Sequence, residues 1–386
     1  MNISCNLMCR PKFIAFYFPQ FHAIPENDIW WGKGFNDWDL VKKTRPLFRG
    51  HKQPRVPLDG IYYNPCQKET LIKQAQLAKS YGIDGFMMYH YWYDGKLLLE
   101  KPLETFLKNR DINIEFCICW ANETWTRAWI GKPEEILIEQ KHSEDEKLWT
   151  AHFNYLLPFF KDPRAIKKDG KPVFVVYQPH LIKNTKAMFR LWNELARQNG
   201  LEGLYYIANK NHSYTGNISF LECYDALLKF QPREAHNSKF FKERTIVDRM
   251  QFLRILPSSV FRYLQKFKYK LYDYKIIDSN KIWQIILSHA YKNEFSQYQL
   301  DIYESGYFEW DNTPRYNDKA RIFTDPGRES KLKYLRELTN KAIENHAAFV
   351  FWNAWNEWSE GAHLEPDTSS EYENLEIVKE IFGTEN

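Results

Sequence analysis

Short apolar runs alternate with segments of helical periodicity along most of the chain. The apolar runs predict strands at Phe13–Phe18, Asp84–His90, Ile114–Trp120, Pro172–Tyr177, Leu204–Ala208, Asp225–Phe230 and Ala348–Asn353, with the seventh of eight somewhere in Asp301–Trp310. The segments of helical period are Glu69–Tyr81, Pro102–Lys108, Glu144–Phe160, Ala187–Asn199, Lys331–Asn345 and Glu373–Ile381. This alternation is typical of βα units around a parallel sheet. It predicts an α/β fold of the (β/α)8 TIM type.

A doubly wound open sheet is the alternative arrangement of such units. That fold usually carries a glycine-rich phosphate loop after its first strand, whereas here Gln20 and His22 follow. No short-period repeat and no Gly/Ser linker divides the chain, so residues 1–386 are predicted to form a single domain. The aromatic and basic stretch 231–300 is predicted to be an insertion, helical around Val247–Leu256 and Phe261–Lys270.

Composition changes this picture in one respect, the abundance of aromatic residues. The chain has 14 Trp, 24 Tyr and 27 Phe, which is 17% of its residues, and such rings stack on the C–H faces of sugars as well as filling cores. The net charge of +4 is too balanced to indicate nucleic-acid binding. A small basic cluster, Lys266, Lys268, Lys270 and Lys275, either touches a membrane surface or simply faces water.

Six cysteines occur, and none has a partner motif of the zinc-binding kind. They are expected to be reduced, mostly buried thiols. The N-terminal segment lacks the apolar stretch of a signal peptide, and no run approaches the roughly 20 apolar residues of a membrane span. The chain is therefore expected to be cytoplasmic.

Polar and aromatic residues follow at least five of the predicted strands. In a parallel barrel the carboxyl ends of the strands meet at one rim, where the active sites of this fold lie. A single polar segment after a strand is ordinary. Five such segments together, all rich in Trp and Tyr, indicate a cleft for a glycan. The candidate substrate-binding residues are Gln20, His22, Trp38, His90, Tyr91, Trp92, Trp120, Asn122, Glu123, Trp125, Arg127, Tyr177, Asn353, Trp355, Asn356 and Trp358.

The segment after the eighth strand contains two glutamates, Glu357 and Glu360. Cleavage of a glycosidic bond needs one carboxyl to protonate the departing oxygen and another to act as nucleophile or base. Residues spaced three apart have their side chains on one side of a turn. The chain must therefore curve here, and Gly361 permits that curve. Flanking Trp rings would help to keep one carboxyl protonated. The alternative is an exposed acidic helix start.

Several other candidates have a structural interpretation as well. Glu123 could bind sugar hydroxyls or form a salt bridge with Arg127, and His22 and His90 could bind hydroxyls or be structural. Asp37, beside Trp38, is expected in a loop that covers the rim. Asp311, in a turn after the seventh strand, is a further side chain that could face the site.

At five places the chain resembles the WbsX family of bacterial O-antigen and capsule loci, which is similar to glycoside hydrolase family 99. The motifs are Tyr17–Trp38, Tyr89–Lys96, Trp120–Trp125, Gly170–Tyr177 and Trp352–Asp367. The resemblance implies a (β/α)8 barrel and a retaining endo-acting enzyme for a mannose-like substrate, with no metal or cofactor. It also implies a route through a 1,2-anhydro sugar. Carried over by motif, Glu360 is the acid/base and Glu357 removes the proton of the sugar 2-hydroxyl.

The predicted function is that of a glycosidase or transglycosidase of O-antigen, capsular or lipopolysaccharide metabolism. Its expected partner is a polysaccharide or oligosaccharide, together with peripheral contact to membrane-bound assembly machinery. The first alternative is a WbsX-type glycosyltransferase with an activated sugar donor, although the sequence has no phosphate-binding glycine loop. The second is a glycan-binding barrel without catalysis.

Overall fold

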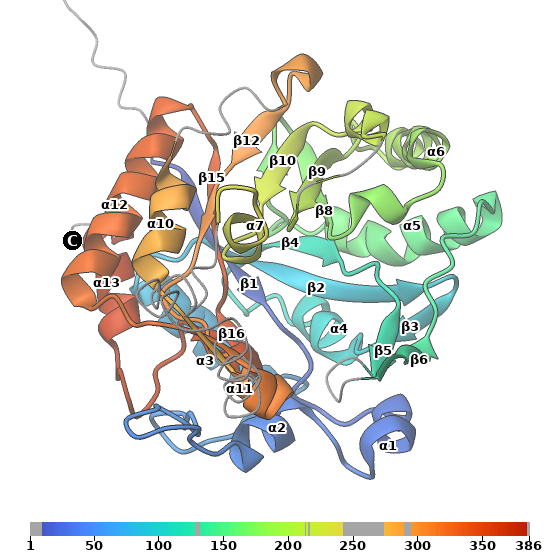
Figure 1. Cartoon of the computed structure of the whole chain (residues 1–386). Coiled ribbons are helices and arrows are strands. Elements are labelled where there is room, and N and C mark those ends of the chain that lie inside the picture. Colours follow the sequence, from blue (N-terminus) through green and yellow to red (C-terminus); the bar gives the residue numbers. More distant parts are fainter. Residues whose placement is uncertain are drawn as a thin grey trace, which may run out of the picture.

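The computed structural model describes residues 10–127, 132–212, 214, 217–241, 274–288 and 295–383. Within these residues a parallel sheet runs in the order β12-β10-β9-β8-β4-β2-β1-β15-β13 (Figure 1). Its strands are β1 (Lys12–Tyr17), β2 (Gly85–Tyr93), β4 (Glu115–Trp120), β8 (Lys171–Val176), β9 (Tyr205–Lys210), β10 (Ala226–Lys229), β12 (Asp301–Tyr303), β13 (Ser305–Gly306) and β15 (Phe349–Trp352).

The two ends of this order belong to one extended stretch of chain. β12 pairs with β10 and β13 pairs with β15, and only Glu304 separates them. The backbone oxygen of Glu304 accepts a hydrogen bond of 3.0 Å from the backbone N–H of Phe351, so the stretch bridges both neighbours. The nine strands therefore occupy eight positions around a closed ring. This confirms the predicted (β/α)8 barrel, and it places the seventh strand within the predicted range.

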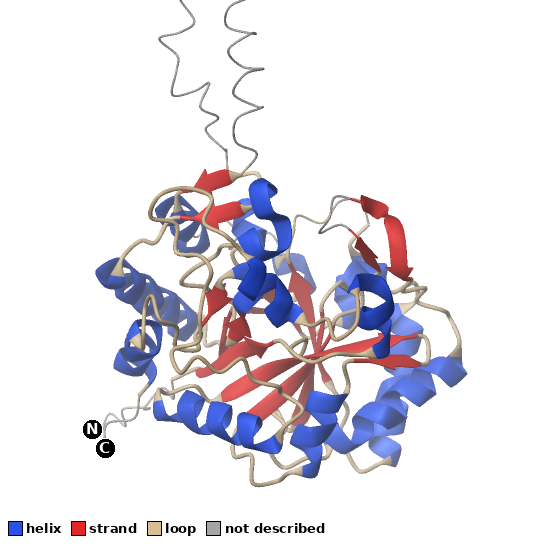
Figure 2. Ribbon diagram, turned by 90° about the horizontal axis from the view of Figure 1, so that it is seen from below, coloured by secondary structure: helices blue, strands red, loops and turns tan. Residues whose placement is uncertain are grey.

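Helices surround this ring of strands (Figure 2). The longer ones are α3 (Lys68–Ser80), α4 (Lys101–Lys108), α5 (Glu146–Phe160), α6 (Thr185–Gln198), α10 (Ser279–Leu287), α12 (Arg328–Glu344) and α13 (Glu373–Phe382). All but α10 match predicted helices to within about three residues at either end. Among the described residues, no helix is both long enough and apolar enough to cross a membrane.

Shorter elements lie in the connections that the sequence pattern left without structure. The helices among them are α1 (Pro25–Trp31), α2 (Asp37–Lys43), α7 (Arg233–His236) and α11 (Thr313–Tyr316). The strands are β3 (Lys96–Leu98), β5 (Trp125–Arg127), β6 (Lys132–Ile138), β7 (Lys167–Lys168), β11 (Lys275–Ile277), β14 (Arg321–Phe323), β16 (Asn356–Glu357) and β17 (Ala362–His363). α1, α2, α7, α11 and the β5–β6 pair all contribute residues to the site described below or hold it in place.

Alternate side chains of each barrel strand belong to two separate cores. On β2, Met87, Tyr89 and Tyr91 face the barrel interior, whereas Met88 and Trp92 pack between the sheet and the helices. Both faces of β2 are buried along its whole length. The parity of a residue along its strand therefore decides whether its side chain can reach the mouth of the barrel.

The predicted insertion 231–300 is described only in part. Its described residues include α7, β11 and α10, and Trp283 of α10 stacks on Tyr307 at 5.5 Å between ring centroids. β11 carries Lys275 and pairs with β14. The predicted helices Val247–Leu256 and Phe261–Lys270, and the other three lysines of the basic cluster, lie outside the described residues.

Four of the six cysteines lie among the described residues, and all four are free thiols. Cys117 and Cys119 are buried in the barrel interior, where burial raises the pKa of each thiol above its usual value. Cys66 and Cys223 are half-buried.

Candidate active site

A cleft of about 280 Å3 opens at the carboxyl ends of the strands. Phe18 reaches it from the end of β1, Tyr89 and Tyr91 from β2, and Tyr177 from the end of β8. Its other lining residues are Gln20, Asn27, Trp31, Phe35, Ala121, Glu123, Thr124, Trp125, Thr126, Leu137, Phe230, Arg233, Arg315, Tyr316, Glu357 and Glu360. The cleft thus combines aromatic walls with three carboxyl groups and two guanidinium groups.

Seven of the predicted site residues line this cleft. They are Gln20, Tyr91, Glu123, Trp125, Tyr177, Glu357 and Glu360. The amide nitrogen of Gln20 donates to the hydroxyl of Tyr91 at 2.9 Å. A carboxylate oxygen of Glu123 accepts a bond of 3.3 Å from the side chain of Gln178. The catalytic roles predicted for Glu357 and Glu360 and the substrate-binding roles predicted for the other five remain predictions, but the structure brings these residues together.

The chain curves where the sequence requires it to curve, between the two glutamates. Glu357 ends β16, and a single 3₁₀ turn from Trp358 to Glu360 follows. The turn closes at Gly361, whose φ is +59°. A Cβ atom there would lie 3.0 Å from backbone atoms of Asp311, so both the backbone angle and the space favour glycine. Glu357 and Glu360 consequently face the same cavity.

A single buried arginine binds both glutamates. Arg315 donates from Nη1 to Glu360 Oε1 at 2.6 Å and from Nη2 to Glu357 Oε2 at 3.2 Å. Its guanidinium lies over the ring of Phe18, 5.2 Å from the ring centroid. A planar fork of donors suits two carboxylates at once. Arg315 was not among the predicted site residues, although it ends the same turn segment in which Asp311 was a candidate.

Asp311 itself faces away from the cleft. Its Oδ2 accepts hydrogen bonds of 2.7 Å from both His51 and Gln53, and its Oδ1 accepts one from the backbone N–H of Thr313. These contacts anchor the start of α11 to the loop between α2 and α3. Asp311 thereby holds the short helix that presents Arg315.

A second guanidinium, that of Arg233 on α7, also binds Glu360. Its Nη2 donates to Glu360 Oε1 at 2.9 Å, and its Nη1 donates to the hydroxyl of Tyr177 at 3.3 Å. About a third of this side chain is exposed, in contrast to the buried Arg315. Sequence pattern could not have indicated Arg233, because it lies in the predicted insertion, far from the motif of the glutamates.

Burial raises the pKa of Glu357 to about 8. The neighbouring carboxylates of Glu360 and Asp37 act in the same direction, while Arg315 opposes them. Burial also raises the pKa of Glu123, against the opposing charge of Arg233. The cleft therefore holds a carboxyl group that exchanges a proton close to neutral pH, as general acid–base catalysis requires.

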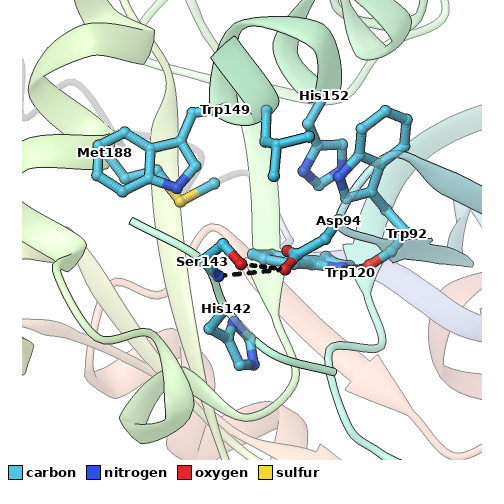
Figure 3. A pocket seen from close by; sticks show the side chains of 9 residues that line it. Trp92, Asp94, Trp120, His142, Ser143, Trp149, His152 and Met188 are labelled. Carbon is cyan, nitrogen blue, oxygen red and sulfur yellow. Dashed lines mark hydrogen bonds between the residues drawn. The ribbon is translucent and has the colours of Figure 1, made fainter. Parts of the chain in front are cut away.

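Three residues that were predicted to bind substrate lie on the outer face of the sheet, because alternate residues of a strand point to opposite faces. His90 Nε2 lies 2.9 Å from Nε2 of His152 on α5, and Trp92 stacks on the ring of His152 at 4.7 Å. The indole N–H of Trp120 donates to the backbone oxygen of Trp92 at 3.1 Å. Trp92, Trp120 and His152 line a separate cavity of about 10 Å3, room for one water, next to the hydrogen bond from Ser143 to Asp94 (Figure 3). The geometry gives the three predicted residues no access to a substrate in the cleft.

Three predicted asparagines hold strand ends together instead of lining the cleft. Asn356 accepts from the backbone N–H of Phe18 at 2.7 Å and donates to its backbone oxygen at 2.9 Å. Asn122 forms the same pair of bonds with the backbone of Gln178, at 2.7 and 2.9 Å. Asn353 donates to the backbone oxygen of Gln231 at 3.0 Å. Each amide substitutes for missing ladder bonds where neighbouring strands diverge.

The remaining predicted residues are also outside the cleft lining. Trp38, Trp355 and Trp358 are buried, and Trp38 packs on Trp358 at 5.4 Å between ring centroids. His22 is buried with its Nδ1 3.0 Å from the backbone oxygen of Pro19.

Arg127 is the last of these. It pairs with Glu135 across the β5–β6 hairpin at 3.2 Å instead of with Glu123, and its guanidinium lies 5.0 Å from the ring centroid of Trp31. Arg127 therefore supports the cleft wall through Trp31, which lines the cleft.

The buried pair His90–His152 is expected to make the fold sensitive to acid. Burial lowers the pKa of His90 to about 3 and lowers that of His152 as well. Between these values and the ordinary pKa near 6.5, the unfolded chain binds more protons than the folded chain. We therefore expect the free energy of unfolding to fall as the pH drops below about 6.5, by roughly 1.4 kcal/mol per pH unit per histidine.

Urea unfolding at pH 7.5, 6 and 5 measures this slope. His152→Gln should make the slope shallower, since glutamine cannot be protonated in the unfolded chain. His346→Asn, at an exposed histidine, should leave it unchanged. Equal slopes in the wild type and His152→Gln would contradict the assignment.

Comparison with known proteins agrees with this architecture. Among solved structures, a glycoside hydrolase-like protein has a TM-score of 0.59 at 13% identity, covering 97% of this chain and 95% of that one. The GH99 endo-alpha-mannosidase from Bacteroides thetaiotaomicron has a TM-score of 0.54 at 14% identity, covering 95% and 94%. Likeness at this level of identity concerns the fold.

A family model identifies the family, and curated relatives match most of the chain. The WxcX proteins of two strains of Xanthomonas campestris pv. campestris are each 32% identical over 374 residues, covering 96% of this chain and 49% of theirs. The chain thus spans about half the length of these curated relatives. The family model described as "Glycosyltransferase WbsX" matches residues 13–378. The chain therefore belongs to the WbsX family.

Proposed function

We propose that this protein breaks or transfers glycosidic bonds by acid–base catalysis with Glu357 and Glu360. The observation that carries the proposal is the pair of carboxyl groups bound by one buried guanidinium inside a cleft with aromatic walls. Enzymes that act on glycosidic bonds use two carboxyl groups in this way. The position of the cleft, at the carboxyl ends of the barrel strands, is where this fold carries its active sites.

The two glutamates are proposed to have different roles. In the order that the resemblance to family 99 implies, Glu360 protonates the leaving oxygen and Glu357 takes the proton of the sugar 2-hydroxyl. A hydroxyl is a weak acid, so a base whose own pKa is raised removes its proton more readily. The raised pKa of Glu357 suits this role, and Arg315 stabilises the carboxylate that acts.

The substrate is proposed to be a mannose-like unit within a bacterial surface polysaccharide, such as an O-antigen or capsule. Trp31, Trp125 and Tyr91 offer aromatic faces of the kind that stack on sugar rings. The fold likeness to an endo-alpha-mannosidase supports the choice of sugar. Contact with membrane-bound assembly machinery belongs to the same proposal.

Transfer from a sugar nucleotide is the second candidate, and the description of the family favours it. A nucleotide diphosphate needs cationic partners. In the described cleft both guanidinium groups already bind Glu360, and three carboxyl groups face the same space. This charge arrangement favours a neutral glycan over a diphosphate.

A turnover assay without any nucleotide is expected to release products that the Glu360→Gln variant does not release. The substrates are surface polysaccharide from the source strain and an α-mannan, each with and without the common sugar nucleotides, and mass spectrometry detects the products. Turnover only in the presence of a nucleotide would show a glycosyltransferase. Binding of glycans with no turnover under any condition would show a non-catalytic barrel.

A further inference from the structure

We propose that Asp37 and Ser359 are positioning residues that set the orientation of Arg315 and, through it, of the two glutamates. The inference rests on the proposed function, because it concerns the same site. Neither side chain lines the cleft, and neither was predicted to act in catalysis. Together they form a relay from the start of α2 to the guanidinium.

The hydroxyl of Ser359 connects the two charged groups. Its oxygen accepts a hydrogen bond of 2.8 Å from Nε of Arg315. Its single proton is donated to Oδ2 of Asp37. Because a hydroxyl has one proton, this bond direction leaves only its lone pairs for Arg315. The orientation of the guanidinium is therefore tied to the position of the Asp37 carboxylate.

Asp37 is itself held rigidly. It is the first residue of α2, and Asn36 before it forms a capping box, with its side chain accepting from Trp38 N at 3.1 Å and its own N–H donating to Asp39 Oδ2 at 3.1 Å. The backbone N–H of Asp37 donates to the backbone oxygen of Gln20 at 3.1 Å. The helix start is thus fixed to the chain that leaves β1.

The relay lies where water cannot replace it. Asp37 is 2% exposed and Ser359 is fully buried. The guanidinium of Arg315 has the Ser359 oxygen at Nε, Glu360 at Nη1 and Glu357 at Nη2, and Asp37 lies 3.6 Å from Nη2. Acceptors therefore surround the whole fork. Loss of the Ser359 contact would let the guanidinium turn about its last bonds and change the alignment of both glutamates.

Asp37 also contributes its charge to the site. The charged groups that act on Glu357 are Arg315, Glu360, Asp37 and Arg233. Asp37 and Glu360 raise the pKa of Glu357, whereas the two arginines lower it. An isosteric change of Asp37 to Asn keeps a hydrogen-bond acceptor for Ser359 and removes only the charge. Asp37 thus has an orienting effect and an electrostatic effect, and mutation can separate them.

Four variants separate these effects in the full chain. Asp37→Ala and Ser359→Ala remove the relay and should lower kcat about 10- to 100-fold with little change in KM, since a small misplacement of catalytic groups acts on the reaction step. Asp37→Asn should lower kcat less and move the pH midpoint of kcat/KM to a lower value. Asp318→Asn is the matched control, because it makes the same change at an exposed aspartate that takes no part in the relay or in the capping box of α2. It should leave kcat unchanged.

A second measurement needs no turnover. Infrared titration of protein labelled with [13C]glutamate follows the protonated glutamic carboxyl band, and Glu357→Gln assigns the part that belongs to Glu357. The midpoint should shift to lower pH in Asp37→Asn and stay unchanged in Asp318→Asn. An unchanged midpoint in Asp37→Asn, or a kcat loss in Asp318→Asn equal to that in Ser359→Ala, would overturn the proposal. If the wild type cleaves no glycan, the proposed function fails while this titration still decides the positioning role.

Discussion

Glu357→Gln is expected to lower kcat for glycan turnover by about 10²- to 10⁴-fold, with KM changed much less. The amide keeps the shape of the side chain and can still bind near Arg315, but it cannot take up a proton. Glu376→Gln is the control, because Glu376 is an exposed glutamate on α13. Activity in Glu357→Gln within a few-fold of the wild type would contradict a catalytic role for this carboxyl group.

The pH dependence identifies the direction of proton transfer at Glu357. Burial raises its pKa to about 8, so the base is largely protonated at pH 7 and ionises as the pH rises. If Glu357 acts as the base, kcat/KM for the wild type increases as the pH rises through about 8. A rate that falls through the same range would instead make Glu357 the proton donor, and the order of the two glutamates would be reversed.

The variant Glu360→Gln tests whether Glu360 is the acid that protonates the leaving oxygen. If Glu360 is the acid, a glycan with an activated aryl leaving group should recover much of the lost rate in this variant, because such a group departs without protonation. The same substrate should not rescue Glu357→Gln. Rescue of both variants, or of neither, would contradict the assignment of distinct roles.

Arg315→Met is expected to destabilise the fold by about 3–5 kcal/mol at pH 7, because it leaves buried carboxylates without their cation. Asp37, Glu357 and Glu360 all lie within 4 Å of this guanidinium. Burial already holds the pKa values of Asp37 and Glu357 above their usual values, and without the guanidinium they rise further, so the folded chain of the variant binds more protons than its unfolded chain. The free energy of unfolding that Arg315→Met loses should therefore become smaller as the pH falls and larger as the pH rises.

Urea unfolding at pH 5 and pH 8 measures this difference. Arg233→Met serves as the control, and its loss of stability should be smaller because its side chain is 37% exposed and solvent screens its pairing. Arg315→Lys keeps the charge without the fork geometry, and it should retain more stability than Arg315→Met while losing activity. An equal loss of stability in Arg315→Met at the two pH values would contradict the role of Arg315 as the cation of these carboxylates.

The elements of the barrel could be predicted from the sequence because their signals are local. The strand Glu115–Trp120 is a continuous apolar run after its first residue, and α5 is an apolar-periodic segment with Asp145 as its cap. The turn between Glu357 and Glu360 was also predictable, since Gly361 and the spacing of three constrain the backbone locally. These features follow from propensity, periodicity and sterics within a few residues.

The face of each barrel strand that lines the cleft was decided by the tertiary structure. Tyr89 and Tyr91 reach the cleft, while His90 and Trp92 lie behind the sheet. An alternating pattern would have shown this, but the strands of a parallel barrel are buried on both faces and read as unbroken apolar runs. The sequence therefore indicated which segments reach the rim, but not which of their residues do.

By itself, the sequence determined the order of strands and helices, the closed barrel and the paired glutamates at its rim. The tertiary structure decided their surroundings: Arg315, Arg233 and Asp37 come from α11, α7 and α2, far away along the chain. A buried charge must find its partner in space, and nothing in the local pattern of residues encodes which distant loop will supply it.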